Sequence, residues 1–274
     1  MKPNRIAVTL MLGMASLAVA AESGDTIARP IVSSYALEIG GATLADTYLT
    51  PMRYHGTRLA LSGGWKKRLP AAPERLSMMF DADIEGAFTT NPVGNARMYL
   101  LEADFDWGML YHFYPAQGWT IAAGASVGFD AGVMYLPRNG NNPASAIADL
   151  HLSLNARAAW QTRIRRVPVV VADAVTLPSL SAFFTPQFGE SYYEIYLGNR
   201  DSLAHAGWWG NRFGIDNLLS ADFIFGRRAL TVGYRYRIDT SWANSLSSRR
   251  ESHSLVIGVT FGAEGNKLAK EISQ

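Results

Sequence analysis

Long stretches of the chain alternate between apolar and polar side chains. The alternation is longest over residues 97–113, where the odd positions are mostly apolar and the even positions include Glu102, Asp104 and Asp106. A period of two residues indicates a β-strand with one buried face. The pattern recurs, more weakly in the last three cases, over residues 56–67, 76–89, 119–130, 148–164, 228–240, 33–42, 215–226 and 252–262.

The length of these stretches favours a membrane barrel over a soluble sandwich. Strands of soluble proteins usually have about five or six residues, whereas several of these runs have the length of tilted membrane-spanning strands. We therefore predict an all-β protein, a transmembrane antiparallel up-and-down β-barrel. Residues 148–164 and 215–226 should run in the same direction, so an odd number of strands crosses between them. One crossing gives ten strands and three give twelve. Ten is favoured because Pro168, Pro178 and Pro186 cannot all lie inside paired strands.

The connections suggest an orientation. Short links are expected at 69–75, 115–118 and 226–228, and long loops at 43–55, 131–147 and 240–251. Short turns of bacterial barrels face the periplasm. This orientation gathers four tryptophans of the apolar faces near the periplasmic interface, as an aromatic girdle would require: Trp65, Trp107, Trp119 and Trp160.

The N-terminus has the layout of a secretory signal peptide. Lys2 and Arg5 precede a mostly apolar run, and Ala18-Val19-Ala20 is a small-x-small cleavage pattern. We predict a signal peptide over 1–21, a barrel over 22–262 and a polar tail over 263–274. Loss of Lys2 and Arg5 reduces the 25 basic residues to 23, which equals the number of acidic residues. A neutral chain gives no reason to expect a nucleic-acid partner, and the absence of cysteine excludes a thiolate metal site.

Two segments resemble a known family. "FFTPQFGESYYEIYLGN" (183–199) and "SHSLVIGVTFG" (252–262) are similar to segments of an uncharacterised family of outer-membrane β-barrel proteins from Bacteroidetes. The resemblance implies the cell outer membrane as location and implies no activity. The expected partners are then outer-membrane lipid, the barrel-assembly machinery and a small solute or ion.

Six carboxylates form the most unusual feature of the polar faces. If 76–89 and 97–113 pair with residue numbers that sum to 187, Asp81, Asp83 and Glu85 lie opposite Asp106, Asp104 and Glu102. Like charges in direct opposition destabilise a sheet, so we expect compensation by basic residues of the lumen: Arg58, Lys66, Arg157, Arg163, Arg235 and Arg237. This acidic ladder is either a salt-bridged core of a filled barrel or the lining of a cation-preferring pore. The balance of charges gives no reason to expect a metal ion, and no cofactor is expected.

A histidine and a serine lie side by side in "RRESHSLVIG" (249–258). Alternation directs His253 to the lipid and Ser254 to the lumen, so the two cannot act as base and nucleophile, which need hydrogen-bond contact. We therefore predict a non-enzymatic protein, either a structural or surface-binding barrel or a narrow cation-preferring channel. The alternative is an outer-leaflet lipid hydrolase, in which His253 lies at the outer end of its strand, is oriented by Glu251 and receives a serine from elsewhere, such as Ser241.

Two segments of the outer region have a less definite pattern. "GESYYEIY" (189–196) is predicted to be a strand with Glu190, Tyr192, Glu194 and Tyr196 on one face, and "AGWWGNR" (206–212) to be an outer loop. His55 and His205 are predicted to be isolated loop residues.

Overall fold

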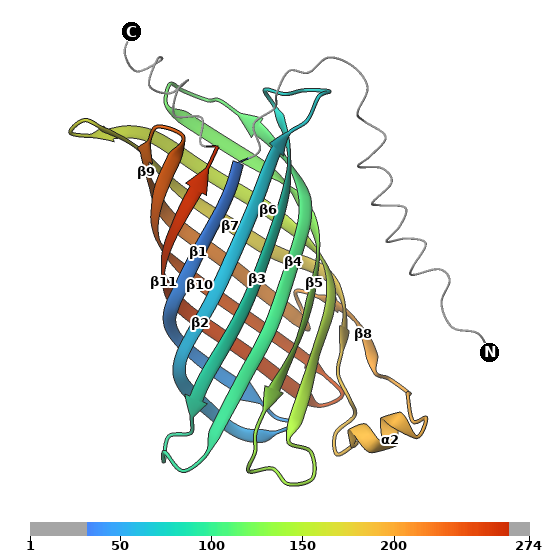
Figure 1. Ribbon diagram of the computed structural model, residues 1–274. Helices are drawn as coiled ribbons and strands as arrows, with labels where there is room; N and C mark the ends of the chain where they lie inside the picture. Colours follow the sequence, from blue (N-terminus) through green and yellow to red (C-terminus); the bar gives the residue numbers. More distant parts are fainter. Residues whose placement is uncertain (1–31, 263–274) are drawn as a thin grey trace.

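A computed structural model describes residues 32–262 and shows a closed antiparallel barrel (Figure 1). The predicted signal peptide and the polar tail lie outside the described residues. The barrel strands are β1 (Val32–Asp46), β2 (Thr50–Arg68), β3 (Leu76–Thr90), β4 (Arg97–Phe113), β5 (Trp119–Tyr135), β6 (Ala144–Ile164), β7 (Val167–Phe184), β9 (Arg212–Phe225), β10 (Arg228–Ala243) and β11 (Leu246–Phe261).

The wall is an up-and-down meander with two joins between strands that are not consecutive. β1 pairs with β11, and β7 pairs directly with β9, although the short strand β8 (Ala204–Trp208) lies between them in the sequence. β8 itself pairs with one end of β7 and lies outside the ring. The prediction of ten barrel strands is confirmed and the alternative of twelve is wrong. Within the described residues no helix is long and apolar enough to cross a membrane.

The two faces of the wall differ as the alternation predicts. Along β6, Leu150, Leu152 and Leu154 are about half exposed on the outside, whereas Asp149 and His151 are buried inside. Aromatic side chains form contacts on the outer face: Trp119 stacks on Trp160 of the neighbouring strand, and Trp65 packs against Phe80, which pairs with Trp107. These contacts lie towards the end of the barrel that contains Val32 and Phe261, which we call the inner end.

The opposite end, which we call the outer end, has shorter connections than predicted. β1 and β2 are joined by residues 47–49, β5 and β6 by 136–143, and β10 and β11 by Asn244 and Ser245 alone. Asn244 and Ser245 both have positive φ angles, of 51° and 60°, as two-residue hairpin turns require. The predicted long loops at 43–55, 131–147 and 240–251 are therefore wrong. Most of their residues extend the strands, and His55 lies within β2.

The proline-rich segment 167–198 forms one crossing strand and then leaves the wall. Pro168 lies next to the start of β7, Pro178 lies where the pairing with β6 shifts its register, and Pro186 follows the strand. The chain then forms the short helix α2 (Tyr192–Tyr196) and returns through β8, at the side of the outer end (Figure 1). The prediction of a strand over 189–196 is wrong. Ser191 and Glu194 form a capping box that starts a helix instead. The predicted loop 206–212 is part of β8, a turn and the first residue of β9, and His205 lies in β8.

Close approach of neighbouring strands generates the first testable prediction. A Cβ atom added to Gly124 in β5 would lie 1.9 Å from the carbonyl oxygen of Met109 in β4, whereas one added to Gly140 in a loop meets nothing within 4 Å. Gly124→Ala should therefore force the two strands apart and lower the free energy of unfolding by about 1–3 kcal/mol. Urea unfolding from detergent micelles measures this change, with Gly140→Ala as the control. Equal stability of the two variants would contradict the packing of the wall.

Candidate functional site in the barrel lumen

The acidic ladder has the register predicted from the sequence. β3 and β4 place Asp81 opposite Asp106, Asp83 opposite Asp104, and Glu85 opposite Glu102. The row continues further around the wall than predicted, because Asp104 also lies opposite Asp130 of β5, and Asp130 opposite Asp149 of β6. Four aspartates on four consecutive strands thus face one lumen. Such a row needs positive charge from the other side of the barrel.

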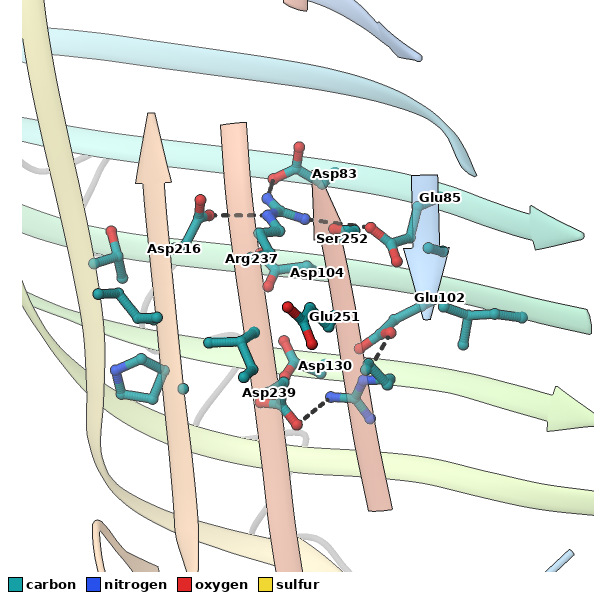
Figure 2. Close-up of a pocket in the computed structure, with 18 of the residues that line it drawn as sticks. Asp83, Glu85, Glu102, Asp104, Asp130, Asp216, Arg237, Asp239, Glu251 and Ser252 are labelled. Carbon is teal, nitrogen blue, oxygen red and sulfur yellow. Dashed lines mark hydrogen bonds and ion pairs between the residues drawn. The ribbon is translucent and has the colours of Figure 1, made fainter. Parts of the chain in front are cut away.

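Three arginines supply this charge in a group that we call the central ion-pair layer. Arg237 of β10 lies 2.8 Å from Asp83 and 3.0 Å from Asp216 of β9 (Figure 2). Arg235 contacts Glu38 at 2.7 Å, Asp83 at 3.0 Å and Asp216 at 2.5 Å. The third is Arg58, which contacts Glu38 at 2.7 Å and also pairs with Glu85.

The central ion-pair layer extends across the lumen. Asp83 on β3 and Asp216 on β9 are separated by β2, β1, β11 and β10 along one side of the ring, and the same two arginines bind both. The side chains of Arg58 and Glu38 are 1% exposed. Removal of one partner from such a buried network leaves an uncompensated charge and is strongly destabilising. The layer therefore both holds opposite walls together and fills the space between them.

A second group, the outer ion-pair layer, surrounds Arg212 and Arg250. Arg212 of β9 lies 2.7 Å from Asp149 and 3.6 Å from Asp130, and it also pairs with Asp239. Arg250 of β11 lies 2.9 Å from Asp239 and 3.3 Å from Glu102. For Asp104, by contrast, no basic group lies within 4 Å in the described part of the chain. Carboxylates outnumber basic groups in this part of the lumen.

An apolar cluster, which the alternation of the sequence does not predict, fills the lumen beyond the outer ion-pair layer. Its largest members are almost completely buried: Leu44, Tyr54, Met98 and Met134 are each at most 1% exposed. With them pack Ala42, Leu49, Ala87, Ala96, Leu100, Leu136 and Ile147. We call this cluster the apolar plug. Its residues occupy inward positions of β1 to β6 and the turns that join these strands, closer to the outer end than the acidic ladder, so the lumen is not polar throughout.

Besides a cavity of about 40 Å³ at the outer end, lined by Asp46, Met134 and Arg250 among others, two cavities lie deeper in the lumen. The outer one, of about 100 Å³, is lined by carboxylates of the ladder and by Asp130 and His151. The inner one, of about 200 Å³, is lined by Lys66, Asp81 and Arg157 among others. Arg235 and Asp83 of the central ion-pair layer line the inner cavity, and Arg237 and Asp83 line the outer one. The layer therefore separates the two cavities.

The predicted basic residues of the lumen fall into three groups. Arg58, Arg235 and Arg237 bind the acids as expected. Lys66 and Arg157 line the inner cavity, and neither has a carboxylate within 4 Å among the described residues. Arg163 is exposed near the inner end of β6 and takes no part in the ion pairs of the described lumen.

Several residues of the ion-pair layers were missed by sequence reasoning. Glu38 and Asp216 lie in predicted strands with weak alternation, and Arg212 and Arg250 lie in predicted loops. Asp239 lies in the predicted strand 228–240, whose pattern indicates no partner for it. These residues could have been recognised from the alternation of inward and outward positions along each strand. That alternation can be followed only when the strand boundaries are correct.

His253 faces outward as predicted, but its position along the strand differs from the prediction. β11 begins at Leu246, so His253 lies well inside the strand and not at its outer end. Its imidazole lies over Gly41 of β1, where an added Cβ would meet Nε2 at 2.6 Å. Ser254 points inward and its hydroxyl accepts a hydrogen bond from Arg58. Ser241 pairs with Ser248, further towards the outer end, so the strand pairing does not bring it to His253. The geometry gives the lipid-hydrolase alternative no support.

Hydrogen bonds tie the segment around α2 to the outer end of the barrel. The hydroxyl of Tyr48, in the turn between β1 and β2, donates to the carbonyl of Glu190 at 2.6 Å. Burial raises the pKa of Tyr48 to about 12, so this hydroxyl stays protonated at neutral pH. Backbone and side-chain hydrogen bonds from Ser191 lower the pKa of Glu194 and keep the capping carboxylate charged.

The ion pairs predict different effects for mutations of Arg235 and Arg157, two lumen arginines that are equivalent in the sequence pattern. Arg235→Met should lower the free energy of unfolding by about 3–5 kcal/mol, because Glu38, Asp83 and Asp216 lose their shared partner. Arg157→Met should cost much less, since no carboxylate lies within 4 Å of Arg157 among the described residues. Urea unfolding followed by tryptophan fluorescence compares them. Equal losses would mean that the central ion-pair layer does not hold the walls together.

Opposite faces of β11 give a further prediction. Ser254→Leu places a bulky group against Arg58, in a position that is 1% exposed, and should destabilise the barrel by about 1–3 kcal/mol. His253→Ala should leave folding and membrane lipid composition unchanged. Lipid profiles of a host that lacks its own outer-membrane lipases provide the measurement. Deacylated lipid that appears with the wild-type protein and disappears with His253→Ala would establish the hydrolase instead.

Comparisons with known proteins place the chain in a family without giving it an activity. Among solved structures, the chain is similar to the outer membrane protease OmpT from Escherichia coli, with 8% identity, a TM-score of 0.48 and coverage of 88% of this chain and 99% of that one. It is also similar to the transport unit of the autotransporter AIDA-I from Escherichia coli, with 9% identity, a TM-score of 0.49 and coverage of 92% and 97%.

Neisserial surface protein A shows 13% identity, a TM-score of 0.35 and coverage of 85% and 96%. No curated protein matches the sequence. One family model, described as a protein of unknown function (DUF3316), matches residues 6–262. The chain belongs to this family.

Proposed function

We propose that the protein is an outer-membrane β-barrel with a closed lumen, which acts as a structural or surface-binding module and not as an enzyme or an open channel. The observation that carries this proposal is the double closure of the lumen. The central ion-pair layer crosses it, and the apolar plug fills its outer end with side chains such as Met98, which is 0% exposed. Neither ions nor solutes have a continuous aqueous path through such an interior.

The outer surface supports the membrane location. Outward-facing apolar side chains from many strands are about half exposed, among them Leu61, Leu101, Leu150 and Ile257. A continuous apolar exterior on a closed barrel fits lipid, because all backbone hydrogen bonds are satisfied between strands. In this proposal the inner end faces the periplasm and the outer end faces the outside of the cell.

The segment between β7 and β8 would then be displayed at the cell surface. It contains large apolar side chains that are mostly exposed, namely Phe188, Tyr193, Tyr196 and Leu197. Aromatic residues of this kind dominate the energetics of protein interfaces. A surface-binding role would use this segment, with the closed barrel as its anchor.

A narrow cation-preferring channel is the second candidate. The observation in its favour is the excess of carboxylates around the outer cavity, where Glu102, Asp104, Asp106 and Asp130 share one space. Carboxylate groups that line a pore select cations. For such a channel to conduct, both the central ion-pair layer and the apolar plug would have to open.

Planar-bilayer recording distinguishes the two candidates. The closed barrel should give no steady current at moderate voltage, and Asp83→Asn and Asp104→Asn should leave the membrane equally silent. Resistance of the inserted protein to protease and its altered migration on unheated gels show that the sample is folded and inserted. Steady wild-type current with a cation preference that falls in both variants would overturn the closed barrel and establish the channel.

A further inference from the structure

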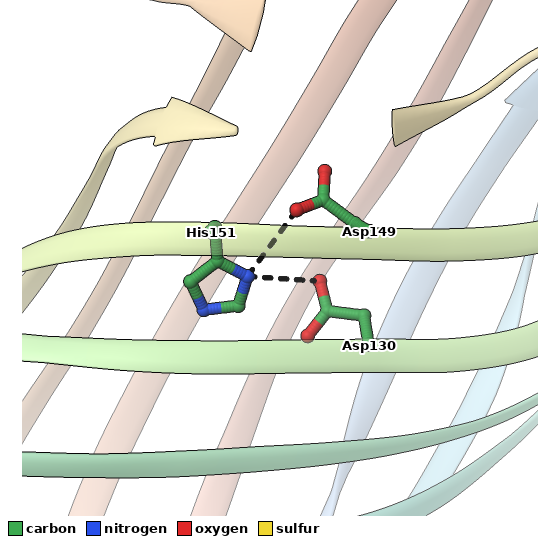
Figure 3. Close-up of side chains that lie close together, drawn as sticks. All are labelled: Asp130, Asp149 and His151. Carbon is green, nitrogen blue, oxygen red and sulfur yellow. Dashed lines mark ion pairs between the residues drawn. The ribbon is translucent and has the colours of Figure 1, made fainter. Parts of the chain in front are cut away.

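Two aspartates and a histidine at the outer ion-pair layer form a group of three potential metal ligands within the described lumen. Asp149 and His151 are two residues apart on β6 and therefore share its inward face, and Asp130 lies directly opposite Asp149 on β5 (Figure 3). Each offers one ligand atom, and these atoms all lie within 4.8 Å of one another. The three residues are 2–6% exposed.

Each of the three side chains has one polar atom without a hydrogen bond. These atoms are Oδ1 of Asp130, Oδ1 of Asp149 and Nδ1 of His151, all buried. Nδ1 lies 3.3 Å from Oδ1 of Asp149, but the two groups are not aligned for a hydrogen bond. Oδ2 of Asp130 lies 3.9 Å from the same Nδ1. Buried polar groups are nearly always satisfied, so unsatisfied atoms on three adjacent buried side chains indicate a missing ligand.

The remaining atoms of the same groups are already occupied. Nε of Arg212 donates to Oδ2 of Asp149 at 2.7 Å, and its Nη2 lies 3.6 Å from Oδ2 of Asp130. Arg212 thus binds Oδ2 of both carboxylates, which leaves Oδ1 of Asp149 without a hydrogen bond beside Nδ1 of the histidine. An arginine that merely neutralised the aspartates would not account for the third unsatisfied atom, on the imidazole.

Surrounding residues orient the imidazole as they do in metal sites. Its Nε2 faces Oδ1 of Asp106 at 3.7 Å, and Asp106 accepts a hydrogen bond from Ser126 at 2.7 Å. Gly128 makes room for this arrangement, because an added Cβ would lie 2.1 Å from Nε2 of His151 and 2.7 Å from Oδ1 of Asp106. A carboxylate behind the second nitrogen of a histidine fixes the ring and strengthens it as a ligand.

We propose that Asp130, Asp149 and His151 bind one divalent transition-metal ion, such as Zn²⁺, through one carboxylate oxygen of each aspartate and Nδ1 of the histidine. Ligand atoms about 2.0–2.2 Å from one ion are at most about 4.4 Å apart, so the observed cluster needs only a slight contraction. The imidazole disfavours Mg²⁺ and Ca²⁺, which prefer oxygen ligands. The adjoining cavity of about 100 Å³ has room for water as a further ligand. The ion also offsets the excess of negative charge around Asp104.

Metal titration of the folded full-length protein in detergent, after treatment with a chelator, tests this site. Wild type should bind one equivalent of Zn²⁺ in competition with a chromophoric chelator. Asp130→Asn and His151→Gln should weaken this binding by more than about 100-fold, and Asp106→Asn by about 10–100-fold. Asp81→Asn is the matched control, since it removes a ladder carboxylate at the inner cavity and should bind like wild type. Equal binding in all four variants, or none by the folded wild type, overturns the site.

X-ray absorption at the zinc edge gives a readout on wild type that does not depend on the folding of any variant. The first shell should contain nitrogen and oxygen at about 2.0–2.2 Å, with the multiple scattering of one imidazole. A shell of oxygen alone would overturn the role of His151. The proposals of a metal site and of a closed lumen can be tested separately. A closed barrel gives no current whether or not it binds the ion.

Discussion

Neutralisation of charge across a narrow lumen is the constraint on which the rest of this structure depends. Closing ten strands into one ring brings every inward side chain into a shared, poorly hydrated space. Asp83, Asp104, Asp130 and Asp149 then lie side by side around the wall, and their repulsion must be balanced from β9, β10 and β11. The arginines that do this also connect the opposite walls, so electrostatic balance and mechanical closure have the same origin.

The fold could be predicted from the sequence because the alternation is local. A period of two assigns each residue to a face, and the requirement that polar faces coincide restricts the hairpin register to odd sums of residue numbers. The register with the sum 187, which places Asp83 opposite Asp104, is one of these and is the one observed. The alternation does not predict which charged side chain each lumen residue contacts on the opposite wall. Arg58 and Arg157 both have inward positions, but only Arg58 lies where Glu38 and Glu85 converge. That difference depends on strand tilt and on the curvature of the ring, which no local pattern contains.

The errors at the outer end have a physical cause. Beyond the apolar band both faces of a strand can be polar, and the contrast that reveals a strand disappears. Arg249 and Glu251 face outward there and pair with each other at 2.6 Å, so their strand resembled a loop in the sequence. Inside the same end the positions are apolar, as at Met98 and Leu100, which reverses the rule followed in the membrane. The capping box of Ser191 and Glu194 was visible in the sequence, but the neighbouring tyrosines resembled a strand more strongly.

The distribution of charge distinguishes the two ion-pair layers. In the central layer, three arginines meet four carboxylates and nearly every donor and acceptor is used. In the outer layer, Arg212 and Arg250 pair with Glu102, Asp130, Asp149 and Asp239, Asp104 has no basic partner within 4 Å among the described residues, and three buried atoms remain unsatisfied. A fully satisfied network suits a permanent closure, because any rearrangement would break several strong contacts at once. An unsatisfied network of carboxylates with one imidazole has the composition of a cation site. The same lumen therefore joins a region that is complete without a ligand to one that is not.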